Sequence, residues 1–159
     1  MKRKRTTTLM IVFGVTAFLA IVSLSLGAWF FASAFEATTA DAVAATQNFD
    51  DVRHRFGSTG PVFEIGADEE PRLRRQPPAV GPAAAPQTLH VRHWGPDDDR
   101  LSDVSIPFWL LRLKAGAFSV SSHHAGLRDV TAEQIERYGP TLLVDHQGHG
   151  GDRLLIWTE

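Results

Sequence analysis

Residues 9–31, LMIVFGVTAFLAIVSLSLGAWFF, contain no charged side chain. A helix rises about 1.5 Å per residue, so this stretch would extend roughly 34 Å, enough to cross a hydrocarbon core of about 30 Å. A lone segment in hydrocarbon satisfies its backbone hydrogen bonds only as a helix. The stretch therefore predicts a transmembrane helix that serves as a signal anchor. Its membrane residues would be Leu9, Ile11, Val12, Phe13, Phe18, Leu19, Ile21 and Val22, followed by an aromatic belt of Trp29, Phe30 and Phe31.

The charges on either side of this stretch predict its orientation. Residues 2–5 are all Lys or Arg, whereas the first charged side chains after the stretch are Glu36 and Asp41. Because loops rich in Lys and Arg stay in the cytoplasm, residues 1–8 are expected there as a basic tail, with the C-terminal part outside it. The chain would then be a single-pass membrane protein whose first partner is the lipid bilayer.

Two other interpretations of residues 9–31 stay open. Ala32-Ser33-Ala34 fits the small-residue site of a cleaved secretory signal, although the apolar run is longer than the roughly 7–15 residues usual for such signals. The second alternative is a buried helix of a soluble domain. An anchor and a cleaved signal place the rest of the chain in the same compartment, so only the mature mass separates these two.

Composition narrows the classes of partner. Four of the 16 basic residues stand at positions 2–5, which leaves 12 against 18 acidic residues in the rest of the chain, a balance of −6. Nucleic acid selects clustered Lys and Arg, so we expect no nucleic-acid partner. Cys is absent, which excludes disulfides and thiolate metal sites, and no cofactor is predicted. The many Ala, Arg, Gly and Pro residues suggest a bacterial sequence, with the C-terminal domain in the periplasm.

Residues 32–57 predict a juxtamembrane helical stalk. Phe35, Ala42, Phe49 and Phe56 recur every seven residues, and the first helix breaker after them is Gly57. Two such stalks could pair as a homodimeric coiled coil. Alternatively, the same stripe docks on the domain that follows, which we favour because the repeat is short.

Residues 58–159 predict a small domain of mixed helix and strand. Residues 62–65 and 88–94 have the composition of strands, and a Pro- and Ala-rich exposed loop is expected at 67–87. Residues 106–113 fit a short helix slightly better than a strand. Thr131 and Gln134 have the spacing of a capping box, so a helix is predicted within 130–140, ending at Gly139 and Pro140.

The last part of the chain predicts a hairpin of strands at 141–145 and 153–158. Residues 154–157 are apolar on both faces, which places this strand in the middle of a sheet or under cover. The predicted fold class is α+β, with one N-terminal transmembrane helix and a helical stalk, followed by a small mixed α/β-sheet domain. The expected core residues are Ile135, Tyr138, Leu142, Val144, Leu154 and Ile156.

The candidates for a chemical site are few. His146 and His149 flank a glycine loop beside Asp145 and Asp152, and zinc or a similar ion accepts imidazole and carboxylate ligands. No pair of histidines has the helical i,i+4 spacing of a strong metal motif. The serines near His123 lack a G-x-S-x-G elbow, so no catalytic residue and no enzyme is predicted.

Phe108 and Trp109 belong to the most hydrophobic stretch outside residues 9–31. They either fill the core or, if exposed, mark a contact with a partner. The sequence as a whole predicts a single-pass membrane-anchored protein whose extracytoplasmic domain is a non-enzymatic interaction module for another membrane or periplasmic protein. The alternative function is a ligand- or metal-responsive domain that uses the His146 and His149 loop.

Overall fold

A computed structural model describes residues 16, 18, 20–25, 34–66, 71–79, 81, 82, 84–113 and 130–159. The chain divides into two compact units, Met1–Phe35 and Glu36–Glu159. In the first unit the described residues of 9–31 are helical, and the side chains of Phe18, Ile21 and Leu24 are exposed. Among the described residues, no helix combines the length and the hydropathy needed to cross a membrane. The other predicted membrane residues lie outside the described part of the chain, namely Leu9, Ile11, Val12, Phe13, Leu19, Trp29, Phe30 and Phe31.

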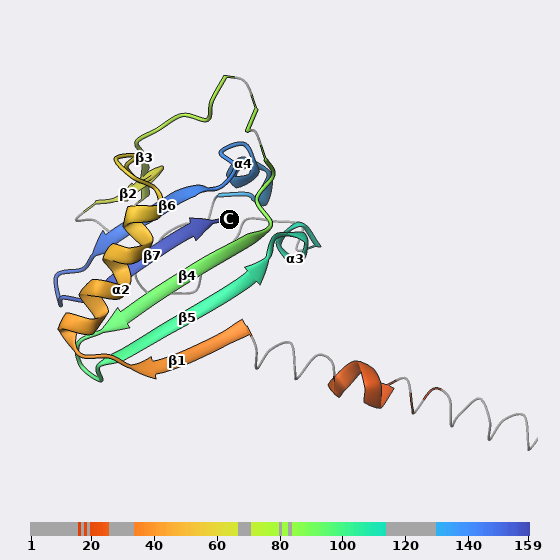
Figure 1. Ribbon diagram of the computed structural model, residues 1–159. Helices are drawn as coiled ribbons and strands as arrows, with labels where there is room; N and C mark the ends of the chain where they lie inside the picture. The colour runs from red at the N-terminus through yellow and green to blue at the C-terminus, as the bar shows by residue number, and fades with distance from the viewer. Residues whose placement is uncertain are drawn as a thin grey trace, which may run out of the picture. The chain divides into compact units, whose positions relative to one another are not determined.

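Within the described residues, the second unit is a mixed α+β fold around a seven-stranded sheet with the order β1-β5-β4-β7-β6-β2-β3 (Figure 1). This confirms the α+β class of the domain. The strands are β1 (Phe35–Thr39), β2 (Phe63–Ile65), β3 (Pro71–Leu73), β4 (Thr88–Gly95), β5 (Arg100–Pro107), β6 (Thr141–Gln147) and β7 (Arg153–Thr158). The helices of this unit are α2 (Ala42–Arg55), α3 (Phe108–Leu113) and α4 (Ala132–Glu136).

Strand β7 lies in the middle of the sheet, as its sequence predicts. It pairs antiparallel with β4 on one side and with β6 on the other. Successive side chains of a strand point to opposite faces, so an apolar run such as Leu154–Trp157 can be buried only where both faces are covered. All four of these side chains are buried.

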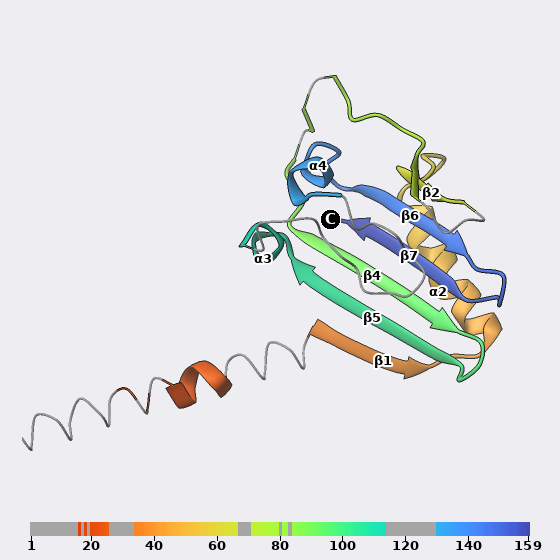
Figure 2. The ribbon, with the colours of Figure 1, turned by 180° about the vertical axis from the view of Figure 1, so that it is seen from behind.

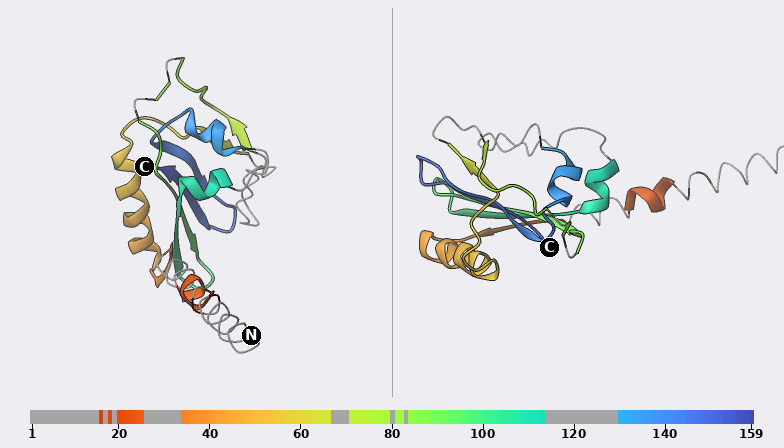
Figure 3. Two further views of the ribbon diagram at one scale, coloured as in Figure 1. Left: turned by 90° about the vertical axis from the view of Figure 1, so that its right-hand side faces the viewer. Right: turned by 90° about the horizontal axis from the view of Figure 1, so that it is seen from above.

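The helices cover the two faces of the sheet separately. Helix α2 packs on one face through Ala45, Phe49 and Val52, where the sheet contributes Trp94, Leu101, Leu142, Leu155 and Trp157. Helices α3 and α4 pack on the other face, where Phe108, Leu111 and Ile135 join a second apolar cluster. Figure 3 shows the sheet on edge with α2 on one side and α3 and α4 on the other. In the view from behind, α2 passes behind the strands (Figure 2).

Local contacts set the position of α2. The Asp41 carboxylate accepts a hydrogen bond from the Ala44 backbone N–H at 2.7 Å, which caps the first turn. Arg53 and Arg55 stand in the last turn, where positive charge stabilises the carboxyl end of a helix. The segment between β1 and α2 is tied to the sheet, because the buried Trp94 indole N–H donates to the Ala40 carbonyl at 2.8 Å.

The expectation that residues 32–57 form a helical stalk is wrong for Phe35–Thr39. Residues Phe35–Thr39 form the edge strand β1 rather than the first turns of a helix, and the helix begins only at Ala42. Phe49 and Val52, which belong to the stripe expected to pair two stalks, are buried against the sheet of their own domain. The docking alternative therefore holds for α2, whose buried residues Ala45, Phe49 and Val52 face the sheet.

The remaining elements match the sequence with two further corrections, the first of which is β5, a strand that was not expected. The loop expected at 67–87 contains a strand, because Pro71–Leu73 pairs antiparallel with β2. The capping box of α4 is present, with the Thr131 hydroxyl accepting from the Gln134 N–H at 3.2 Å and the Gln134 amide oxygen accepting from the Thr131 N–H at 2.8 Å. The predicted core residues Ile135, Leu142, Val144, Leu154 and Ile156 are buried, and Tyr138 is partly buried against them.

Candidate functional site

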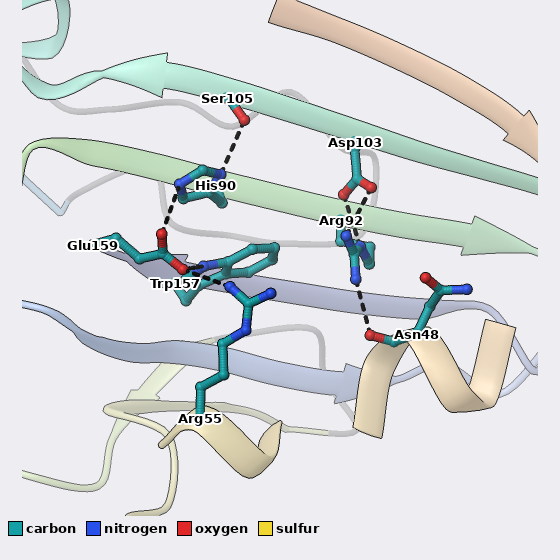
Figure 4. Close-up of polar contacts among 8 residues, drawn as sticks. All are labelled: Asn48, Arg55, His90, Arg92, Asp103, Ser105, Trp157 and Glu159. Atoms are coloured by element: carbon teal, nitrogen blue, oxygen red, sulfur yellow. Dashed lines mark hydrogen bonds and ion pairs between the residues drawn. The ribbon is translucent and has the colours of Figure 1, made fainter. Parts of the chain in front are cut away.

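A row of polar and aromatic side chains crosses β5, β4 and β7 on the face that carries α2. In the strand register, His90 of β4 stands opposite Ser105 of β5 on one side and opposite Trp157 of β7 on the other. Two residues further along, Asp103 stands opposite Arg92. Residues that face one another across antiparallel strands have side chains close enough to interact. The pairing of the strands alone therefore brings these five residues together (Figure 4).

His90 lies at the centre of the row. Its ring stacks on the Trp157 indole, with centroids 4.9 Å apart and planes inclined by 10°. The Ser105 hydroxyl lies 2.9 Å from Nδ1, and a Glu159 carboxylate oxygen lies 3.8 Å from Nε2. Burial lowers the pKa of His90 below its ordinary value of 6.5, against the opposing effect of the Glu159 and Asp103 carboxylates. The imidazole is therefore neutral at pH 7.

A neutral His90 has one donor and one acceptor nitrogen. The Ser105 hydroxyl can either donate to Nδ1 or accept from it, so the tautomer of the ring sets the direction of this bond. At 3.8 Å the Nε2–Glu159 contact is too long for a direct hydrogen bond. The interaction with Glu159 is thus a weak electrostatic one, and stacking and the Ser105 bond hold the ring.

Arg92 connects the row to α2. Its guanidinium makes a bidentate pair with Asp103, with Nε and NH2 donating to the two carboxylate oxygens at 2.7 and 2.9 Å. The third nitrogen, NH1, donates to the Asn48 carbonyl of α2 at 2.9 Å. The guanidinium carbon also lies 5.5 Å from the centre of the Trp157 ring. A planar fork that donates from all three of its nitrogens is held in one orientation.

Glu159 closes the row beside the end of α2. One of its carboxylate oxygens accepts from the Trp157 indole N–H at 3.1 Å and from Arg55 at 2.9 Å. The side chains of Arg55 and Glu159 are exposed, whereas Arg92 and His90 are mostly buried. The contacts thus run without a break from Arg55 through Glu159 to His90 and Ser105 (Figure 4). We call these residues, together with Arg92, Asp103 and Trp157, the sheet-face network.

Part of the network can be compared with a hydrolytic triad. Ser105, His90 and Glu159 are the residue types of a hydrolytic triad, which also needs N–H donors aimed at the developing oxyanion. The backbone groups of β4 around His90 are used by ladders on both sides, to β5 and to β7. The long Glu159 contact also leaves the imidazole without a firm third partner. Trp157 is buried beneath this row, and the exposed members of the network are the charged side chains of Arg55 and Glu159.

The predicted metal candidates are not brought together. The Asp145 carboxylate is occupied by Arg53 of α2, whose Nε and NH2 donate to its two oxygens, both at 2.7 Å. These bonds to Asp145 raise the pKa of Arg53. Among the described residues, which include His146, His149 and Asp152, no group of three His, Asp or Glu side chains could hold a metal ion.

The two aromatic residues singled out in the sequence have different positions. Phe108 is only 2% exposed and belongs to the core under α3, so for this residue the core alternative holds. Trp109, the next residue, is 59% exposed. Leu110 and Leu113 of the same helix are also exposed. The partner contact expected of an exposed aromatic residue therefore stays a prediction for Trp109.

The sheet-face network has no counterpart in the sequence motifs. Its members are spread from α2 to the last residue, and only the pairing of β4 with β5 and β7 makes them neighbours. The one available signal is alternation, because His90, Arg92 and Trp94 must share a face of β4 if residues 88–94 are a strand. Their partners on β5 could not be placed, because that strand was not expected.

Comparison with known proteins adds no family to these observations. No protein-family model, curated protein or solved structure gives a significant match to the chain. The domain is thus defined by its own architecture, a seven-stranded mixed sheet with α2 on one face and α3 and α4 on the other.

Proposed function

We propose that the protein is a single-pass membrane protein with a cytoplasmic N-terminus, and that residues 36–159 form a non-enzymatic, extracytoplasmic module that binds another membrane or periplasmic protein. The sheet-face network is its contact surface. The observation that carries this proposal is that the network combines charged and aromatic side chains, each held by its neighbours, on a face that α2 covers only in part.

Support for the membrane anchor comes from the chemistry of residues 9–31 and the charges that flank them. In the described part of that segment, the side chains of Phe18, Ile21 and Leu24 are between 62% and 74% exposed. Such a succession of large apolar side chains on a helix is stable only when lipid or protein covers it. The basic residues at 2–5 favour the cytoplasm for the N-terminus.

Support for protein recognition comes from how the network is held. Binding costs side-chain entropy when flexible groups must be ordered at an interface. Arg92 and His90 are already fixed by bonds to Asp103, Asn48 and Ser105, so little ordering remains for them. Arg is also among the residue types most often found at the energetic centres of interfaces, and the buried Trp157 supports the row from the core. The network therefore presents a pre-ordered surface.

A crosslinking experiment in cells tests the contact surface. A photo-crosslinking amino acid is placed in the full-length chain at Ser105, which faces the network, or at Ser102 of the same strand, which lies on the opposite face. Membranes are then isolated and the products are separated by mass. We expect a discrete adduct of higher mass from position 105 and none from position 102.

A charge reversal identifies which side chains the partner recognises. Arg55→Glu changes an exposed member of the network without touching the core. We expect this variant to lower the yield of the position-105 adduct, because the charge presented to the partner is inverted. Equal adducts from positions 102 and 105, or none from either in intact cells, would contradict the proposed contact surface.

A further inference from the structure

Helix α3 has an exposed apolar side, formed by Trp109, Leu110 and Leu113. Phe108 and Leu111 fix the helix to the core, and Arg112 forms an ion pair with Glu136 of α4. The outward residues Trp109 and Leu113 stand one helical turn apart and are 59% and 71% exposed. An indole and a large aliphatic chain are thus held rigidly outward on one side of a short helix.

The place where the chain enters the sheet lies at the same end as α3. The Ala40 N–H, just after β1, donates to the Asp99 carbonyl, just before β5, at 2.8 Å. Since β1 is the neighbour of β5 in the sheet, the end of one strand lies beside the start of the other. Counting from this bond places the start of β1, Phe35, beside about Val104, roughly three residues before Pro107, where β5 leads into α3. Figures 1 and 2 show the two strands running in opposite directions.

Chain length ties this end of the sheet to the membrane. The apolar run ends at Phe31 and β1 begins at Phe35. Fully extended, this connection spans roughly 14 Å, so the start of β1 cannot move farther than that from the point where residue 31 leaves the bilayer. This length is about twice the roughly 5–8 Å depth of one headgroup layer. Helix α3 begins roughly 10 Å farther along β5, so its start stays within roughly 25 Å of that point.

We propose that α3 inserts Trp109 and Leu113 into the outer headgroup layer of the same bilayer that residues 9–31 cross, so that the domain rests with this end on the membrane. Tryptophan favours this layer, because its ring is apolar and its N–H can still bond to water or headgroups. The acidic balance of the domain gives no attraction to anionic lipid, so insertion depends on apolar area alone. The inference rests on the proposed membrane anchor.

The absence of Cys allows a direct measurement of depth. Full-length Leu113→Cys carries an environment-sensitive fluorophore and is reconstituted into vesicles of phosphatidylcholine. The matched control is Val43→Cys at the start of α2, a position 67% exposed at the other end of the sheet. We expect a blue-shifted emission at position 113 that lipids with a quencher in the headgroup region reduce. The label at position 43 should emit as in water and resist the lipid quencher.

The outcomes separate this inference from the anchor. If the protein floats with the vesicles but the label at 113 behaves like the label at 43, insertion of α3 is wrong and the anchor stands. A blue-shifted label that lipid quenchers do not reach would also overturn the inference, because protein then covers α3. A protein that does not float with the vesicles contradicts the anchor itself.

Discussion

Phe49 carries the contact between α2 and the sheet, and its replacement tests that contact. The ring is 0% exposed and packs in the cluster that contains Trp94, Leu155 and Trp157. Phe→Ala in a core removes the buried ring and leaves a cavity, which costs about 3–5 kcal/mol. The Arg53 guanidinium lies 6.0 Å from the ring centre, at the limit of a cation–π contact, and adds little. We therefore expect Phe49→Ala to lose about 3–5 kcal/mol of unfolding free energy.

The control stands on the same helix. Val43 is 67% exposed, so Val43→Ala removes little buried area and changes the unfolding free energy by no more than about 0.5 kcal/mol. Both variants are made in the full-length chain in mild detergent and unfolded with urea, with the fluorescence of the buried Trp94 and Trp157 as the signal. If Phe49→Ala and Val43→Ala both lose less than about 1 kcal/mol, α2 is not docked on the sheet and the reasoning is refuted.

Three further predictions concern single contacts. An NMR titration of His90 should give a pKa below 6.5. Because the unfolded chain then binds the proton more tightly, the unfolding free energy should fall as pH drops below about 6.5, and His90→Gln should flatten that decline. A titration midpoint above 6.5 contradicts the burial of the ring. Gly139→Ala should lower the unfolding free energy by about 1–3 kcal/mol, because φ at this residue is +67° and an added Cβ would lie 2.6 Å from the Pro82 side chain. The control Gly60→Ala should be nearly neutral, because a Cβ there meets open space. Asp145→Asn should cost about 1 kcal/mol through its pair with Arg53, and the loss should shrink in 1 M salt; an unchanged midpoint in urea at low salt counts against this pair.

The parts of the fold that the sequence predicts are those with short-range or strongly apolar signals. The capping box at Thr131 and Gln134 acts within one helical turn, so it can be recognised without knowing the rest of the structure. The run Leu154–Trp157 predicts a central strand, because apolar side chains on both faces need cover on both faces.

The parts that the sequence does not predict depend on tertiary pairing. The edge strand β1 has a helix-compatible composition, and its neighbour β5 in the sheet overrides that preference. Strand β5 itself was missed because Ser102, Asp103 and Ser105 dilute its apolar alternation. The sheet-face network follows from the register of β4 with β5 and β7, and no spacing along the chain reveals it.

The most direct test of the proposed anchor and orientation is the side of the membrane on which the domain lies. Because the chain has no Cys, single-Cys variants Val43→Cys and Thr6→Cys report on the domain and on the basic tail. Spheroplasts expressing each full-length variant are treated with a membrane-impermeant maleimide before and after permeabilisation, and the membranes are washed with carbonate. We expect the chain to stay with the membranes, position 43 to label in intact spheroplasts, and position 6 to label only after permeabilisation. Release of the chain by carbonate, or labelling of position 43 only after permeabilisation, would contradict a membrane-anchored extracytoplasmic domain.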